Sequence, residues 1–137
     1  MRFLDNVLSD FINKAPEQFK DAKYSAERER SVGLGVMGFH SFLQQKRIPL
    51  ESVMAKSWNK KIFKNIHEKV NQASKDLAEE RGACPDAAEY GFKERFSNKT
   101  AIAPTASISI ICGGASPGVE PIAALSLIHI SEPTRPY

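Results

Sequence analysis

The sequence contains little cysteine, little net charge and no long apolar run. Of its 137 residues only Cys84 and Cys112 are cysteines, and because they form no CxxC pair we expect neither a disulfide framework nor a thiol-rich zinc site. A reduced, cytoplasmic protein is therefore the prediction. No apolar run approaches the roughly 20 residues of a membrane span. Asp5 and Asp10 interrupt the apolar pattern of the N-terminus, which excludes a secretory signal.

The small net charge gives no electrostatic case for binding nucleic acid. The formal charge is +3, and Lys and Arg are interleaved with Asp and Glu, as in KKIFKNIHEKV and AERER. Proteins that bind nucleic acid directly usually gather basic residues on one face, so these charges are expected on solvated helix surfaces. His40, His67 and His129 are scattered and have no cysteine at useful spacing, so no metal site is expected.

Apolar residues at three- and four-residue steps predict three helices. The first covers Arg2–Asn13, the second Gly35–Arg47 and the third, much longer, Ser52–Arg81. Between the first two, Pro16 and the polar run EQFKDAKYSAERERS predict a connector, which could contain a helical turn. The stripes behind these predictions are Leu4, Val7, Leu8, Phe11 and Ile12, then Val36, Phe39 and Leu43, then Met54, Trp58, Ile62, Ile66, Val70, Ala73 and Leu77.

The third helix is longer than the rest of the chain can cover. Ser52 is a suitable N-cap, and Gly82 stands where a left-handed residue ends a helix. A helix between these two residues is well above the globular mean of about 11–12 residues. It must pack along a large surface, and a chain of 137 residues supplies little of it. The sequence therefore indicates part of a bigger fold.

Two patterns compete in AIAPTASISI, residues 101–110. Thr100–Ala103 predicts a short buried strand, and Ser107–Ile110 alternates as a strand does. Pro104 followed by small and hydroxylated residues suits the first turn of a helix equally well. If a helix starts here, its unpaired main-chain N–H groups and its dipole favour an anion such as phosphate. Plain helix capping and a core strand remain the alternatives.

Two further motifs have weaker support. GLGVMG, residues 33–38, matches the dinucleotide pattern GxGxxG, but the charged SAERERSV before it is not a buried strand. Close backbone packing at a helix start is the preferred interpretation. Glu120 lies between Gly118 and Pro121, where a buried loop carboxylate could orient amides or a substrate hydroxyl, or cap the turn. No GxSxG motif occurs, and no catalytic residue is predicted.

Four blocks in order resemble the catalytic (large) subunit of ribonucleotide reductase. They are FLDNVL, RSVGLGVMGF, SKDLAEERGACPD and NKTAIAPTASISIICGGASPGVEPIAA, and they span about Arg2 to Ala124. The resemblance implies an α/β fold. Residues 1–124 would be the C-terminal part of that family's ten-stranded α/β barrel domain, mostly helical in this piece. The pair PTxSxS and SxGxEP is the most specific part of the match.

The resemblance also implies the chemistry. The family reduces ribonucleotides to deoxyribonucleotides for DNA synthesis through a cysteine thiyl radical, with a cysteine pair as the reductant. The segment that matches PTASIS binds substrate phosphates, so the resemblance assigns that role to Thr105, Ala106 and Ser107. Cys84 and Cys112 match none of the family's catalytic thiols. The piece alone is therefore expected to be inactive and to hold no cofactor.

Class and partners follow from the resemblance only in part. A class I enzyme uses a separate metal-bearing, radical-generating small subunit, and a class II enzyme uses adenosylcobalamin. Class I is preferred, and class II stays open. The parent subunit is expected to be a homodimer that binds a ribonucleotide, with no membrane contact and no direct nucleic-acid contact. The alternatives from other classes are a non-enzymatic helical interaction module and a phosphate-binding domain of another enzyme.

The last residues differ from everything before them. SLIHISEPTRPY, which ends at Tyr137, shares no periodicity with the preceding segments and resembles a translated sequencing adapter. Residues 125–137 are therefore expected to be a non-native tail, in which neither His129 nor Tyr137 has a role.

Overall fold

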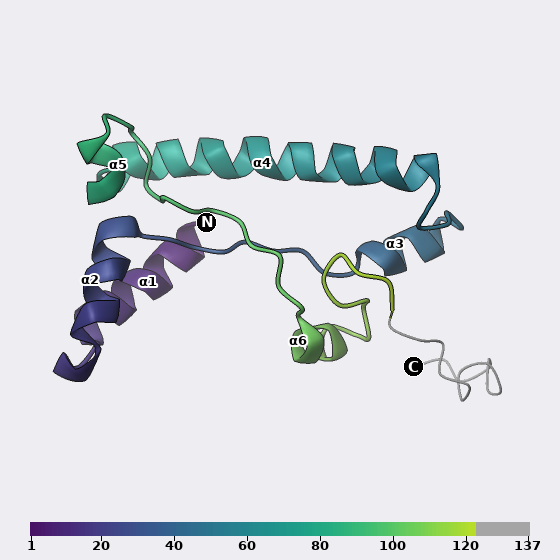
Figure 1. The fold of residues 1–137 in the computed structure, drawn as a ribbon, viewed down its shortest axis with the longest axis horizontal. Coiled ribbons are helices and arrows are strands. Elements are labelled where there is room, and N and C mark those ends of the chain that lie inside the picture. The colour runs from purple at the N-terminus through teal and green to yellow at the C-terminus, as the bar shows by residue number, and fades with distance from the viewer. Residues whose placement is uncertain (123–137) are drawn as a thin grey trace. The chain divides into compact units, whose positions relative to one another are not determined.

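A computed structural model describes residues 1–122 of the chain. The regular elements of these residues are helices (Figure 1). No strand forms among these residues, so the expectation of a mostly helical piece is confirmed. In chain order the elements are α1 (Arg2–Lys14), the 3₁₀ turn η1 (Glu17–Phe19), α2 (Lys20–Glu29), α3 (Phe39–Gln45), α4 (Val53–Arg81), α5 (Pro85–Glu89) and α6 (Ala106–Ile111).

The chain divides into two compact units. Unit 1 combines Met1–Leu34 with Ile62–Ala101, and unit 2 combines Gly35–Lys61 with Ile102–Tyr137, of which residues up to 122 are described. The prediction of a non-native tail at residues 125–137, with His129 and Tyr137, lies outside the described residues and stays a prediction. Within residues 1–122, no helix has the length and apolar character needed to cross a bilayer.

The first helix forms as predicted, but its apolar residues lie on two faces. Ile12 is buried, and Leu4 and Leu8 are half-buried on the same side. Val7 and Phe11, which the sequence places in the same stripe, are 52% and 38% exposed. The apolar stripe read from the sequence therefore combines two adjacent faces of the helix, which a periodicity count does not separate.

The predicted connector after Pro16 was wrong, because Lys20–Glu29 forms a full helix. Its sequence is mostly polar and gives no apolar stripe. It forms where α2 packs against both α1 and α5, and Arg28 forms ion pairs with Asp86 at 2.6 Å and with Glu89 at 2.7 Å. Tertiary contacts of this kind routinely override weak local propensity.

The second predicted helix is shorter at both ends than expected. Gly38 has a left-handed backbone, with φ of 80°, and is the residue before the first turn of α3. The helix therefore begins at Phe39 rather than Gly35 and ends at Gln45, two residues before Arg47. This glycine does act at a helix start, as the packing interpretation of GLGVMG requires.

Gly33–Leu34 lies in extended backbone beside Thr100–Ala101. A side-chain carbon added to Gly33 would lie 2.9 Å from the Ala101 Cβ, so only glycine permits this approach. Leu34 and Thr100 form an isolated parallel bridge, with Leu34 N donating to Lys99 O and Ala101 N donating to Leu34 O. The predicted buried strand at Thr100–Ala103 is thus reduced to this bridge, and its residues are exposed. The dinucleotide pattern needs a strand before its glycines, and no strand precedes Gly33.

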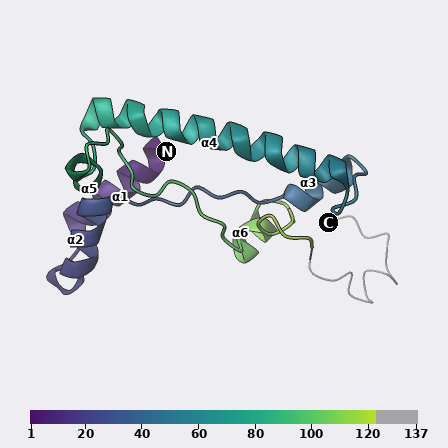
Figure 2. The ribbon, with the colours of Figure 1, turned by 45° about the horizontal axis from the view of Figure 1, so that its top comes forward.

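The long helix is confirmed almost residue for residue. Figures 1 and 2 show α4 as one unbroken helix. Ser52 Oγ accepts from Ala55 N at 3.1 Å, which is the expected N-cap, and Gly82 follows with φ of 90°. Val70 and Leu77 of the predicted stripe are buried, whereas Met54 is 60% exposed. Trp58 packs edge-on against Phe42 of α3, with ring centroids 5.2 Å apart.

Candidate functional site

The segment AIAPTASISI folds into the short helix α6, which decides between its two predicted patterns. Thr105 is the residue before the first turn and has a left-handed backbone, with φ of 55°. Pro104 lies before this residue rather than in the first turn, where the sequence placed it. The core-strand alternative was therefore wrong for this segment, and the helical one is confirmed.

The first turn of α6 leaves three main-chain donors available. The first hydrogen bond of the helix runs from Ser109 N to Thr105 O, at 2.8 Å. Among residues 1–122, the N–H groups of Ala106, Ser107 and Ile108 have no hydrogen-bond acceptor, as is usual for a helix start. Ala106 and Ser107 are also exposed. An anion can therefore approach these amides from solvent.

Thr105 has its hydroxyl fixed by the loop that follows α6. Its Oγ1 accepts a hydrogen bond from Gly118 N at 2.8 Å. Because this bond fills an acceptor position, the O–H remains able to donate. Ser109, which the sequence did not single out, is 3% exposed, and its Oγ donates to Ala106 O at 2.8 Å. Ser109 therefore stabilises the first turn and is not a ligand donor.

Paired hydrogen bonds between Ser116 and Ser41 hold the loop of residues 113–118 in place. Ser116 is 1% exposed, its Oγ accepts from Ser41 N at 3.1 Å, and its own N–H donates to Ser41 Oγ at 2.9 Å. Gly38 N donates to Ser116 O at 2.7 Å. A side-chain carbon on Gly118 would lie 2.9 Å from Ala103 O. The loop thus fits tightly against the segment that leads into α6.

The remaining candidates from the sequence do not gather around α6. Glu120 is exposed, so the expectation of a buried orienting carboxylate was wrong. Cys84 is buried and Cys112 is exposed, and both are free thiols. His67 is exposed and bonds Asn71 at 2.9 Å. Within residues 1–122 no group of three His, Cys, Asp or Glu side chains could hold a metal ion.

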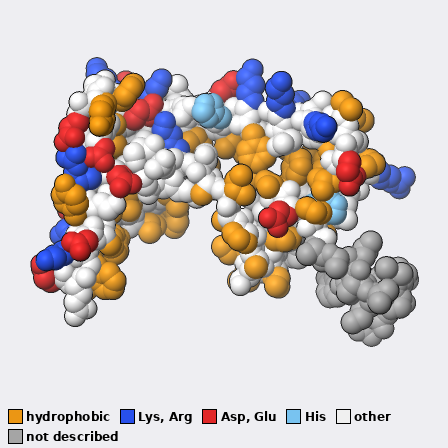
Figure 3. Space-filling view, viewed as in Figure 1, with side chains coloured by type: hydrophobic (Ala, Val, Ile, Leu, Met, Phe, Trp, Pro, Cys, Tyr) orange, Lys and Arg blue, Asp and Glu red, His pale blue; other side chains and the backbone are white. Residues whose placement is uncertain are grey.

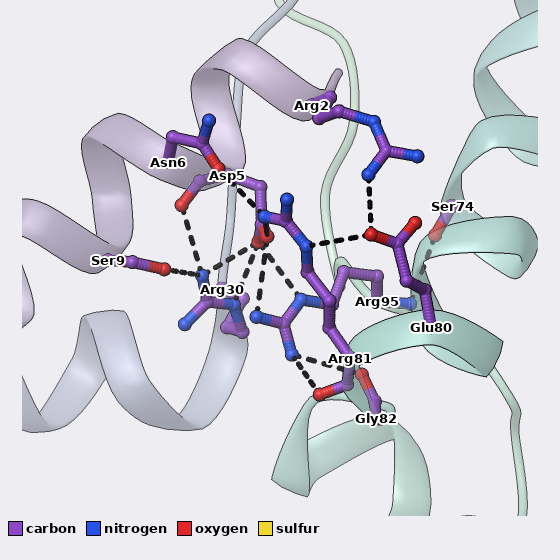
Figure 4. Close-up of polar contacts among 10 residues, drawn as sticks. All are labelled: Arg2, Asp5, Asn6, Ser9, Arg30, Ser74, Glu80, Arg81, Gly82 and Arg95. Carbon is purple, nitrogen blue, oxygen red and sulfur yellow. Dashed lines mark hydrogen bonds and ion pairs between the residues drawn. The ribbon is translucent and has the colours of Figure 1, made fainter.

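A buried carboxylate in unit 1 is the most heavily bonded side chain and was missed by sequence reasoning. Asp5 is fully buried, and three guanidinium groups converge on it (Figure 4). Arg30 Nη2 and Arg95 Nε donate to Asp5 Oδ1 at 2.7 and 2.9 Å, and Arg81 Nη1 donates to Oδ2 at 2.7 Å. The signal in the sequence was an acidic residue on the inward face of α1, between Leu4 and Leu8.

One carboxylate cannot neutralise three guanidinium groups. Glu80 Oε1 lies 3.6 Å from Arg81 Nε and supplies a second negative charge, and neutral carbonyl and hydroxyl oxygens accept further N–H bonds. Arg95 Nη1 also donates to Arg81 O at 3.1 Å and to Gly82 O at 3.0 Å, at the end of α4. Cations are favoured there by the helix dipole. Arg30 Nη2 also donates to Ser9 Oγ at 2.7 Å. The cluster therefore fastens α1 to the end of α4.

The Asp5 cluster should make stability sensitive to acid. Burial acts to raise the pKa of Asp5, but hydrogen bonds from Arg95, Arg30 and Arg81 outweigh it and lower the pKa. A group with a lowered folded pKa stabilises fully above its unfolded value, near 3.9, and loses that contribution as pH falls through the folded value. We expect unfolding titrations to show acid destabilisation below about pH 4 that is weaker in Asp5→Asn. Equal acid slopes in the two proteins would contradict this assignment.

Comparison with known proteins gives one consistent result. The profile of the family "Ribonucleotide reductase, barrel domain" matches residues 1–94. The ribonucleoside-diphosphate reductase large subunit of Invertebrate iridescent virus 3 is 48% identical over 122 residues, which are 89% of this chain and 19% of the relative. A vitamin B12-dependent ribonucleoside-diphosphate reductase of Thermoplasma acidophilum is 41% identical over 134 residues, 93% of this chain and 17% of the relative.

A solved structure agrees with these sequence matches. The Actinobacillus ureae class Id ribonucleotide reductase alpha subunit superposes with a TM-score of 0.81 at 36% identity. The match covers 96% of this chain and 27% of that subunit. The chain thus spans about a fifth of the length of the two sequence relatives described above.

Proposed function

Since the chain belongs to the ribonucleotide reductase family, as a segment of its barrel domain, we propose that it supplies the substrate phosphate-binding loop of a reductase large subunit. The whole subunit would reduce ribonucleotides to deoxyribonucleotides for DNA synthesis. The observation that supports this role most directly is the set of three main-chain N–H groups at the start of α6 that lack acceptors among residues 1–122.

The proposed binding mode uses the chain's own groups. The amides of Ala106 and Ser107 would donate to the phosphate oxygens, at the positive end of the α6 dipole. Thr105 would add its O–H, because Gly118 N already occupies one of its acceptor positions. Ser107 is exposed in the first turn and would add a second hydroxyl. The side chain of Ala106 is small enough to leave the approach open.

The radical chemistry is proposed to reside in other parts of the subunit. Residues 1–122 contain no group of three metal-ligating side chains, so they do not fit a metal centre and we assign no step to one here. The radical source is proposed to be the metal-bearing small subunit of a class I enzyme. Similarity to a vitamin B12-dependent relative at 41% identity supports adenosylcobalamin as the alternative. Either enzyme is proposed to work in the cytoplasm as a homodimer.

The proposed phosphate role predicts a large effect of a negative charge at Ser107. In the complete large subunit, Ser107→Asp places a carboxylate beside the phosphate and removes a donor. We expect KM for the ribonucleotide to rise roughly 10- to 100-fold, which corresponds to about 1.4–2.8 kcal/mol. Steady-state kinetics with the substrate varied measures this change, and Ser107→Ala should raise KM only a few-fold.

The matched control is Ser57→Asp, which adds the same charge at an exposed position of α4. It should leave KM within about twofold of the parent value, as expected for an ordinary surface substitution. An unchanged KM in Ser107→Asp, or an equal rise in both variants, would show that this loop does not bind the substrate phosphate.

A further inference from the structure

The buried Ser116 caps the helix α3 from a distant part of the chain. In a capping box, the residue before a helix accepts from the N–H of the third helical residue, whose side chain accepts a bond in return. Before α3 this position is Gly38, which has no side chain. Ser116 replaces it: its Oγ accepts from Ser41 N at 3.1 Å, and its N–H donates to Ser41 Oγ at 2.9 Å. The first turn of α3 is therefore capped only while the loop of residues 113–118 lies against it.

The same loop also holds the start of α6. Just after Ser116, Gly118 N donates to Thr105 Oγ1 at 2.8 Å. Immediately before Ser116, Ala115 N donates to Ser109 O at 3.1 Å. Ser116 thus lies between two contacts that the loop makes with α6. A displacement of Ser116 is therefore transmitted to the amides that follow Thr105, which are the groups proposed to bind phosphate.

Apolar packing contributes little to the position of α6 within residues 1–122. Ile108, Ile110 and Ile111 are 56%, 75% and 82% exposed, and Figure 3 shows hydrophobic side chains at the surface over this helix. A helix whose apolar side chains stay in solvent gains little from burial, so its placement here depends on hydrogen bonds. Ser116 is 1% exposed, so water cannot replace a bond that its N–H loses.

From these contacts we infer that Ser41 is a positioning residue for the substrate phosphate. The inference rests on the proposed function, because it needs the phosphate at the start of α6. The Ser41 hydroxyl bonds the loop rather than the phosphate donors themselves. It acts by holding Ser116, and the loop in turn holds Thr105. Because coupling between two sites is reciprocal, phosphate bound at α6 should also stabilise the cap of α3.

The first test is kinetic, in the complete large subunit with a ribonucleoside diphosphate as the varied substrate. Ser41→Ala leaves the N–H of Ser116 buried without its acceptor. We expect KM to rise roughly 5- to 20-fold. The value of kcat should stay within about twofold, because contacts made equally in the ground and transition states affect KM alone. Ser41→Thr keeps the hydroxyl acceptor and should hold KM within about twofold of the parent value.

The matched control is Ser74→Ala, because Ser74 is also buried and its Oγ accepts a backbone N–H, from Arg95 at 3.1 Å. This serine lies in unit 1, outside the loop. Its loss should lower stability but leave KM within about twofold. A lower kcat with unchanged KM in Ser41→Ala would indicate loss of folded enzyme only. Equal KM increases in the two alanine variants would indicate a general loosening. Either result would overturn the positioning role.

A second measurement needs no variant. A saturating ribonucleoside diphosphate should slow amide hydrogen exchange at Ser41 at least about fivefold in the parent subunit, and unchanged exchange would contradict the inference. The two proposals fail separately. If Ser107→Asp raises KM and Ser41→Ala does not, the phosphate stays at α6 and only the positioning role is lost. If Ser107→Asp leaves KM unchanged, the proposed function itself fails.

Discussion

Replacing Asp5 with Asn is expected to destabilise unit 1 by about 3–5 kcal/mol, because removing one partner leaves the opposing buried charges uncompensated. Asn keeps the shape of the side chain but turns its N–H₂ group toward guanidinium donors that now have no acceptor. Arg30 and Arg95 are only 10% and 11% exposed at their side chains, so water cannot replace the lost carboxylate. Amide hydrogen exchange of α1 and the end of α4 should accelerate by about two orders of magnitude or more.

The chain offers a matched control on the same helix. Asp10 pairs with Lys14 at 2.7 Å, and its side chain is 62% exposed. Exposed pairs of this spacing contribute about 0.3–0.5 kcal/mol, so Asp10→Asn should change exchange no more than about threefold. Similar effects of the two substitutions would mean that the Asp5 cluster is not the node that joins α1 to α4.

Replacing Gly118 with Ala is expected to disable the proposed phosphate loop. The added carbon would lie 2.9 Å from Ala103 O, and φ at this position is 50°, in the left-handed region. The left-handed backbone costs an alanine about 1–2 kcal/mol, and overpacking typically adds about 1–3 kcal/mol. The loop should relieve the clash by moving, which breaks the bond from Gly118 N to Thr105 Oγ1. In the complete subunit we expect KM for the ribonucleotide to rise at least tenfold.

Gly113→Ala separates backbone strain from the clash. Gly113 lies in the same loop with φ of 83°, but a side-chain carbon there meets nothing within 4 Å. This variant carries only the conformational cost of about 1–2 kcal/mol and should leave KM within about threefold. If the two alanine variants raise KM equally, the contact with Ala103 does not position Thr105.

The sequence predicted correctly those elements that are determined by short-range patterns, such as apolar periodicity and helix-capping residues. The extent of α4, the N-cap at Ser52 and the ending at Gly82 all follow from short-range features, and all three are confirmed. The helix α2 was missed because its contacts, such as those of Arg28 with two acids on α5, join residues far apart in the chain. No window of the sequence contains both partners of such a pair.

In the candidate site too, the local features could be predicted and the long-range contacts could not. A helix start after Pro104 was one of two patterns in the sequence, and the structure selects it. The contact between Thr105 and Gly118 depends on the path by which the loop after α6 comes back to the start of that helix. The spacing of residues in the sequence does not encode this path. The arginines of the Asp5 cluster are likewise distant in sequence. An acid on an inward helix face was the available clue, since a buried carboxylate needs a partner.

The parallel bridge between Leu34 and Thr100 has a consequence for the order of folding. The whole of α3, α4 and α5 lies between its two partners in the chain. Parallel pairing of this kind forms late, because the long segment between the two partners must close into a loop before the first hydrogen bond of the bridge can form. Helices with local contacts form much sooner. During synthesis, the segment around Gly33 therefore stays unpaired until its partner, Thr100, leaves the ribosome. By then the intervening helices have already been synthesised.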